Sequence, residues 1–227
     1  EECLMANAKL AAEMFAKEID LRWHILERAA AEADLRQWLL QANAAPQPIL
    51  VGDALQTKFQ DRMENLHKVN EEATWATSWF LTNRLGTQLA RSPLAEKTIG
   101  QNYRYRDYYH GLGRDLKETE LAADVEPLRT AHRSCVFRSQ SSNRLMVAFT
   151  VPVWDDGRDA GKPQVVGVLG MSVEVASFAS LQRGLSESSV LVLVDGNENR
   201  IEGESWRGAI KEDQREDEIR RGLIVHH

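Results

Sequence analysis

The first 42 residues carry one helical pattern, and its length constrains the fold more than any other feature of the sequence. Apolar residues recur every three or four positions, which places them on one face of a helix: Leu4, Ala8, Ala11, Phe15, Ile19, Trp23, Leu26 and Ala30. A helix of about 40 residues is roughly 60 Å long, which exceeds the diameter of a small domain. Part of its apolar face must pack on the rest of the chain, and a second copy of the helix in a homodimer could cover the remainder. The alternative is a pair of shorter helices folded back on the domain.

The remainder of the chain predicts one more long helix and then a sheet. The second helix begins after Gly52, with Asp53 suited to its N-cap, and ends near Asn70. Runs rich in β-branched and aromatic residues follow at 73–81, 87–91, 134–138, 145–153, 164–173 and 189–195. The first two flank an Asn/Gly turn and predict a β-hairpin. Helices followed by an antiparallel sheet indicate the α+β class.

Between the second and third of these runs lies the segment Tyr-Arg-Tyr-Arg-Asp-Tyr-Tyr at residues 103–109. It gathers four phenol rings and two guanidinium groups around one carboxylate. Arginine offers a rigid planar fork of donors that matches a carboxylate, and tyrosine offers a stiff apolar wall with a polar tip. This combination suits a small pocket for a polar, anionic metabolite. The same residue types also gather on ordinary protein surfaces, so both interpretations stay open on composition alone.

Four segments in a fixed order resemble a known family. They are Arg-Asp-Tyr-Tyr at 106–109, Ala-Phe-Thr-Val-Pro-Val at 148–153, Val-Gly-Val-Leu-Gly at 166–170 and Val-Leu-Val-Leu-Val-Asp-Gly-Asn at 190–197. Together they make residues 73–205 similar to the membrane-distal half of Cache domains, the PAS-like extracytoplasmic sensors of bacterial transmembrane receptors. The resemblance implies a central antiparallel sheet of five to six strands behind a long N-terminal helix. We therefore expect a signalling and dimerisation helix at 1–50, a PAS-like Cache ligand-binding domain at 51–205 and a charged tail or helix at 206–227.

The resemblance also implies ligand contacts. In the amino-acid-sensing branch, Arg106 and Tyr108 match the residues that hold the ligand carboxylate, and Tyr109 matches one of those that hold the ammonium. Two further ammonium contacts of that branch, a tyrosine and an aspartate, fall on Phe137 and Ser172 here. Neither residue carries a charge, and an ammonium removed from water loses several kcal/mol without an anionic or strongly accepting partner. A small carboxylate or another polar metabolite is therefore favoured over an α-amino acid.

Three more residues complete the set of candidate ligand contacts. Asp107 could receive an amine, although it could equally pair with Arg104 or Arg106 and brace the loop. Tyr103 opens the aromatic segment. Trp79 lies in the first strand, where either the pocket floor or core packing would suit it.

Composition and motifs exclude several other functions. With 28 basic and 34 acidic residues the net charge is −6, and no basic stretch predicts a nucleic-acid partner. Cys3 and Cys135 have no metal or redox spacing, and we expect two free thiols. His110 and His132 lack a further ligand at metal spacing. No nucleophile elbow, zinc-protease motif or P-loop is present, so we expect no catalysis, no metal and no cofactor.

These observations predict a sensor module rather than an enzyme. We expect an extracytoplasmic domain of a kinase-type or chemoreceptor-type membrane protein, with the membrane reached only through segments outside this chain, because no stretch approaches 20 apolar residues. Both ends look cut from a longer protein, and the terminal histidines are set aside as possible tag remnants. The alternative is a ligand-free dimerisation or protein-interaction module with a PAS-like fold.

Overall fold

The computed structural model describes residues 2–121, 125–155, 163–175, 193–194 and 225–226. Three long helices come first: α1 (Glu2–Ala30), α2 (Ala33–Ala44) and α3 (Ala54–Thr74). The main sheet contains β1 (Ser78–Asn83), β2 (Gln88–Ser92), β3 (His132–Arg133), β4 (Phe137–Arg138), β5 (Leu145–Trp154) and β6 (Val165–Glu174). Short helical turns lie between the second and third strands: η1 (Glu96–Thr98), α4 (Asp107–His110) and η2 (Glu118–Glu120).

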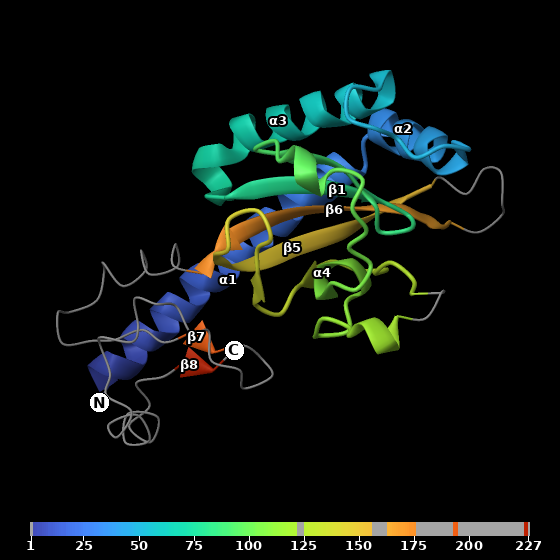
Figure 1. Ribbon diagram of the computed structural model, residues 1–227. Coiled ribbons are helices and arrows are strands. Elements are labelled where there is room, and N and C mark those ends of the chain that lie inside the picture. The colour runs from blue at the N-terminus through green and yellow to red at the C-terminus, as the bar shows by residue number, and fades with distance from the viewer. Residues whose placement is uncertain (1, 122–124, 156–162, 176–192, 195–224, 227) are drawn as a thin grey trace.

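The six strands form one antiparallel sheet, which confirms the predicted α+β class. Their order is β2-β1-β6-β5-β3, and β4 also pairs with β5. Helices α1, α2 and α3 cover one face of this sheet, while α4 lies on the other (Figure 1). A central antiparallel sheet with helices on one face is the arrangement expected from the sequence.

The N-terminal segment is two helices, so the single helix predicted for residues 1–42 is wrong. The chain leaves helical geometry at Glu32, whose backbone is extended with φ −65° and ψ 130°. A 10-residue strand spans only about 33 Å, and the break lets α2 turn back and bury Leu35 and Leu39 on the sheet. Glu32 also forms an ion pair with Arg62 of α3, which holds the corner.

Several strand boundaries differ from the prediction. Helix α3 continues to Thr74, so β1 begins at Ser78 rather than at residue 73. Of the predicted run 134–138, only Phe137 and Arg138 form a strand, β4, whereas β3 lies just before the run. Of the predicted last strand, only Leu193 and Val194 are described; as β7 they pair in parallel with β8 (Val225–His226) in a separate two-stranded sheet. The rest of that strand and most of the charged tail or helix expected at 206–227 lie outside the described residues.

The main core lies between the sheet and the helices. The long strands contribute alternate residues, such as Trp79 and Leu81 of β1 and Phe149 of β5, which are fully or almost fully buried. Trp23 of α1 packs edge-on against Phe149, with ring centroids 6.4 Å apart. Nearer its N-terminus α1 exposes Leu10 and Leu21. A homodimer through this helix stays a prediction.

Candidate functional site

A cavity of about 40 Å³ lies on the sheet face that the long helices leave uncovered. One buried water needs about 10–15 Å³ on this measure, so the cavity has room for about three waters. Its described lining contains two arginines and no acidic residue: Ser78, Phe80, Gln88, Arg91, Thr98, Tyr103, Arg106, Tyr108, Phe137, Ser139, Gln140, Ser141 and Ser172. Five of the eight predicted contact residues are therefore brought together here: Tyr103, Arg106, Tyr108, Phe137 and Ser172.

A β-bulge between β1 and β2 places two polar side chains in this cavity. Thr82 pairs with Gln88 and Phe80 pairs with Arg91, so one extra residue of β2 is accommodated between these pairs. Directly opposed residues of an antiparallel pair share a face. Gln88 and Arg91 consequently face the same side as Phe80, although three positions separate them.

Arg91 supplies a guanidinium group that no carboxylate neutralises among the described residues. Its Nη1 donates to the Pro93 carbonyl oxygen at 2.8 Å, and its Nη2 donates to the Ser141 hydroxyl at 3.0 Å. Both acceptors are neutral. Burial lowers the pKa of Arg91, but a guanidinium group stays protonated in proteins at neutral pH. Among the described residues, this positive charge in the cavity therefore has no counter-ion. Sequence reasoning missed this residue.

Arg106, the predicted anchor, lines the same cavity but is already paired. Its Nη1 donates to Asp115 Oδ2 at 2.6 Å, and its Nη2 donates to the Arg138 carbonyl oxygen at 3.3 Å. The guanidinium carbon lies 4.9 Å from the centroid of the Tyr105 ring and 5.3 Å from that of Phe137. Burial lowers the pKa of Arg106, but the Asp115 carboxylate and the tyrosines Tyr105 and Tyr108 together outweigh burial, and the net pKa is raised. Of the three guanidinium nitrogens of Arg106, Nε alone is buried without a hydrogen-bond partner among the described residues.

Tyr108 presents a hydroxyl group for which no protein hydrogen-bond partner exists among the described residues. The residue is 6% exposed, and its ring packs between Phe80 and Phe137 at centroid distances of 4.9 and 5.3 Å. Burial raises the pKa of Tyr108 well above its ordinary value, so the hydroxyl is protonated at neutral pH. Buried hydroxyls usually have a partner. A free one in a polar cavity is positioned to meet a ligand or a water.

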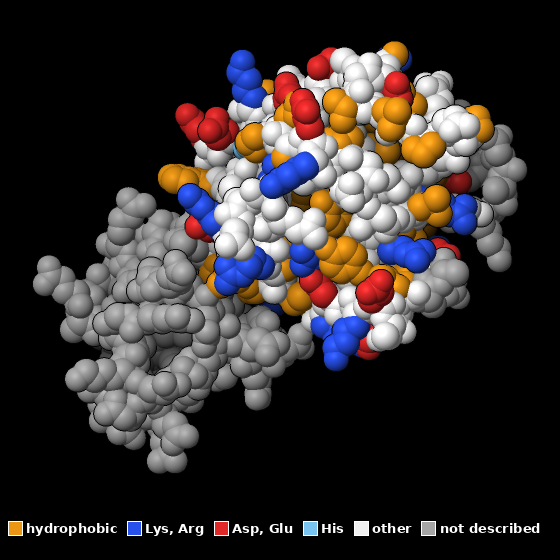
Figure 2. All heavy atoms as spheres, viewed as in Figure 1, with side chains coloured by type: hydrophobic (Ala, Val, Ile, Leu, Met, Phe, Trp, Pro, Cys, Tyr) orange, Lys and Arg blue, Asp and Glu red, His pale blue; other side chains and the backbone are white. Residues whose placement is uncertain are grey.

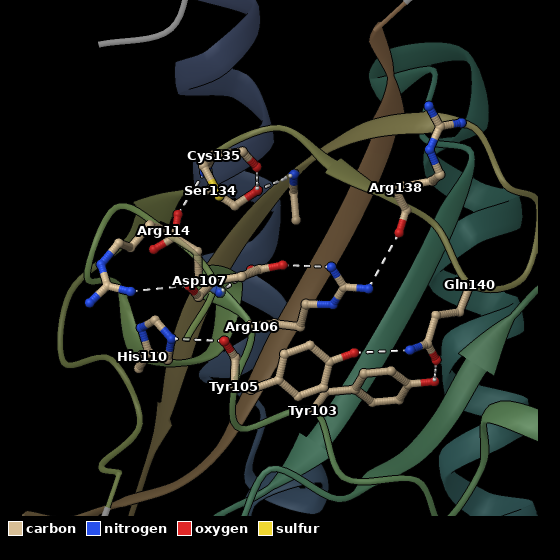
Figure 3. Close-up of polar contacts among 12 residues, drawn as sticks. Tyr103, Tyr105, Arg106, Asp107, His110, Arg114, Ser134, Cys135, Arg138 and Gln140 are labelled. Carbon is tan, nitrogen blue, oxygen red and sulfur yellow. Dashed lines mark hydrogen bonds and ion pairs between the residues drawn. The ribbon is translucent and has the colours of Figure 1, made fainter. Parts of the chain in front are cut away.

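Loop residues 139–141 form the roof. The Tyr103 hydroxyl donates to Gln140 Oε1 at 3.2 Å, and Gln140 Nε2 donates to the Tyr105 hydroxyl at 2.9 Å. Figure 3 shows Gln140 reaching from the loop to both rings, with Arg106 beside them. On the floor, the hydroxyls of Ser78 and Ser172 lie 2.7 Å apart. Apart from the two arginines, the polar groups of the described lining are therefore neutral.

Three of the predicted contact residues lie outside the cavity. Trp79 faces the helices and is fully buried in the main core, because alternation along β1 turns it away from Phe80. Tyr109 is fully buried, and its hydroxyl donates to the Arg84 carbonyl oxygen. Neither residue lines the cavity, although both were among the candidate ligand contacts.

Asp107 is the third, and it braces the loop. Its carboxylate accepts hydrogen bonds from the backbone N–H groups of Gly113 at 2.6 Å and Cys135 at 2.6 Å, and from His132 Nε2 at 3.1 Å. None of these contacts is the predicted pairing with Arg104 or Arg106. Burial raises the pKa of Asp107, but these hydrogen bonds outweigh it and the net pKa is lowered.

The thiol of Cys135 lies beside this carboxylate. Burial and the Asp107 charge raise the pKa of Cys135 to about 12. A thiol that stays protonated is a poor nucleophile, so this cysteine offers no obvious nucleophilic chemistry at neutral pH.

Two larger hollows are lined by other described residues, and neither contains a residue predicted to bind the ligand. One of about 570 Å³ adjoins the α1–α2 break, where the exposed Arg129 stacks over Trp154 at 5.1 Å. The other, of about 380 Å³, is lined by Pro46, Pro48 and neighbouring residues. On the face shown in Figure 2, acidic and basic side chains are interspersed without a patch of one sign.

Comparison with known proteins identifies the fold. No protein-family model matches the chain, and no curated protein matches its sequence significantly. The sensor domain of the V. cholerae histidine kinase DctB superposes with a TM-score of 0.64 at 15% identity, over 97% of this chain and 75% of that one. The chain has the fold of a Cache-type sensor domain.

Two chemoreceptor ligand-binding domains share this Cache fold. That of Campylobacter jejuni Tlp3, solved with 4-methylisoleucine, has a TM-score of 0.57 at 10% identity and covers 93% of this chain and 71% of its own. That of Pseudomonas fluorescens CtaA, solved with L-serine, has a TM-score of 0.55 at 14% identity, covering 93% and 74%. None of the described helices combines the length and apolar character that crossing a membrane requires.

Proposed function

We propose that this chain is the extracytoplasmic ligand-binding domain of a transmembrane signalling receptor, and that it binds a small carboxylate or similar polar metabolite. One observation carries the proposal: the described lining of a cavity on the open face of the sheet contains two guanidinium groups, no acidic side chain and the Tyr108 hydroxyl, which has no hydrogen-bond partner among the described residues. Cationic donors with an unused hydroxyl form a site for an anion. The shared fold with a kinase sensor domain and two chemoreceptor domains supports the sensory role.

The same geometry suggests how binding could be transmitted. A ligand in the cavity would touch β2 through Arg91, α4 through Tyr108 and the roof loop through Ser141, three segments far apart in the sequence. It would favour the conformation in which these segments are close. The shift in the conformational equilibrium cannot exceed the ligand's differential affinity for the two conformations. In this proposal α1, which packs on β5, passes the change to a partner helix in a homodimer and to membrane segments outside the chain.

One specific observation favours a second candidate function. A volume of about 40 Å³ is small for a ligand site. A domain that uses the same fold only for dimerisation would be expected to have a small cavity that binds no ligand. The two functions differ in whether any small molecule stabilises the folded protein.

Two adjacent tyrosines provide the test. Thermal unfolding of the wild-type chain is measured against a panel of small carboxylates, where a ligand at 100 times its Kd adds about 2.7 kcal/mol to the unfolding free energy. Tyr108→Phe should weaken binding about tenfold and leave stability almost unchanged, because its hydroxyl bonds to no described residue. Tyr109→Phe is the matched control. It should cost about 1 kcal/mol of stability and leave the affinity unchanged, because its hydroxyl bonds to a backbone carbonyl.

The outcomes separate the two functions. Stabilisation of the wild type by a carboxylate, with the affinity lost only in Tyr108→Phe, supports a sensor. If no compound in the panel stabilises the wild-type protein, the dimerisation function is favoured instead.

A further inference from the structure

The charges around the cavity do not cancel, and their sum indicates the kind of ligand. Arg106 and Asp115 form an ion pair with a contact of 2.6 Å, so together they contribute no net charge. Arg91 donates only to a carbonyl oxygen and a hydroxyl. The described groups that line the cavity or pair with its arginines therefore amount to one uncompensated positive charge.

A half-buried charge without a counter-ion is unfavourable, because burial removes water that would stabilise it. One carboxylate facing Arg91 would neutralise the cavity. A second carboxylate on the same ligand would meet a guanidinium group that Asp115 already satisfies, and would itself be buried without a partner. An ammonium group would meet only neutral oxygens, such as those of Ser78 and Ser172.

We infer that the cavity selects small monocarboxylates, with Arg91 as the anchor and Asp115 as the residue that excludes a second negative charge. This inference rests on the proposed function, of which it specifies the ligand class. The Tyr108 hydroxyl completes the site, because it can donate to the carboxylate or to a hydroxyl or keto oxygen next to it. Room for about three waters limits the ligand to a few non-hydrogen atoms.

Isothermal titration calorimetry on the full chain tests the selectivity. The probes are acetate, glycolate and pyruvate as monoanions, malonate and succinate as dianions, and glycine as a zwitterion. At least one monoanion should bind the wild type with an affinity at least tenfold higher than either dianion or glycine.

Three variants assign the charges. Arg91→Met should weaken monoanion binding roughly tenfold to a hundredfold, the usual effect of a charge-assisted hydrogen bond. Arg144→Met is the matched control: it removes a positive charge from the loop beside the roof, where Arg144 pairs with Glu174 on the surface, and should leave affinity unchanged. Asp115→Asn should release Arg106 and raise the affinity for malonate at least tenfold relative to acetate.

The possible results are distinguishable. Dianions that bind the wild type as tightly as monoanions, or Arg91→Met with unchanged affinity, would overturn the monocarboxylate inference while leaving the sensor function intact. Failure of every probe, monoanions included, would overturn the proposed carboxylate site itself. The wild-type panel decides the question even if Asp115→Asn does not fold.

Discussion

The two faces of the central sheet are built from alternate residues of the same strands, yet they differ sharply. On the helix face, β6 presents Leu169, Met171 and Val173, all fully buried. On the opposite face, the intervening positions are the small Gly170 and Ser172. Gly170 makes room for the Phe80 ring, because a Cβ there would lie 2.5 Å from Phe80 Cζ, and Ser172 lines the cavity.

The comparison shows how one strand serves two purposes. Close packing of apolar side chains stabilises a fold and resists change. A face with serines, two arginines and an unpartnered phenol contributes less to stability, because buried polar groups offset part of the gain. We therefore expect substitutions on the helix face to alter stability, and substitutions around the cavity to alter binding.

The largest expected change in stability comes from a substitution on the helix face. Trp79→Ala should lower the unfolding free energy by about 3–5 kcal/mol, because it removes a fully buried indole and leaves a cavity. Ligand affinity of the folded fraction should stay the same. Chemical denaturation measures the loss, and Trp79→Phe replaces the alanine variant if that variant is too unstable. If Trp79→Ala lost ligand affinity but kept its stability, Trp79 would belong to the binding site. That result would contradict the proposed difference between the two faces.

An intermediate effect is expected from a residue that belongs to the cavity side of the sheet but stabilises the fold. Asp107→Asn should cost about 2–3 kcal/mol at neutral pH, because the buried carboxylate accepts three hydrogen bonds. In the folded protein the pKa of Asp107 is lowered despite burial, so its contribution is fully present above the unfolded value of 3.8 and disappears as the pH falls through the folded value.

Unfolding free energies of both proteins, measured from neutral pH to below pH 3.8, check this prediction. The difference between wild type and Asp107→Asn should narrow as the pH falls. A difference that does not change with pH would mean that Asp107 is not held as a carboxylate.

The smallest stability effect is expected on the cavity floor. Ser172→Ala removes one half of the hydroxyl pair with Ser78 and should cost about 1 kcal/mol or less, since the remaining hydroxyl faces a cavity that can hold water. Calorimetric unfolding measures the change, with the ligand titration repeated on the same variant. A cost above about 2 kcal/mol would show that this face is as tightly packed as the other.

Local patterns were sufficient to predict the strands but not the helix break. Residues 145–153 and 164–173 are rich in apolar and β-branched residues, and both are strands of nearly that length. The sequence around Glu32 contains no proline or glycine, and after the break α2 packs on β6, more than 100 residues later in the chain. Similarly, the polar residues 70–74 have no strand or turn signal, and α3 simply continues through them.

The site was predicted in part, for a related reason. The segment 103–109 pointed to the region of the cavity, because Tyr103, Arg106 and Tyr108, which line it, are close in the sequence. Arg91 was missed, since simple alternation would place it with Leu89, and only the β-bulge brings it beside Gln88. Arg106 and Asp115 form an ion pair although they are nine positions apart in the chain. The sequence gives no reason to choose Asp115 rather than the adjacent Asp107 as the partner of Arg106.

A crystal structure of the chain with acetate or pyruvate at a concentration near its measured Kd tests the central claim most directly. The account predicts one carboxylate in the cavity, within hydrogen-bond distance of the Arg91 guanidinium and the Tyr108 hydroxyl, with the Arg106–Asp115 pair unbroken. A carboxylate bound at another place, or a cavity closed by the side chains of its own lining, would contradict it.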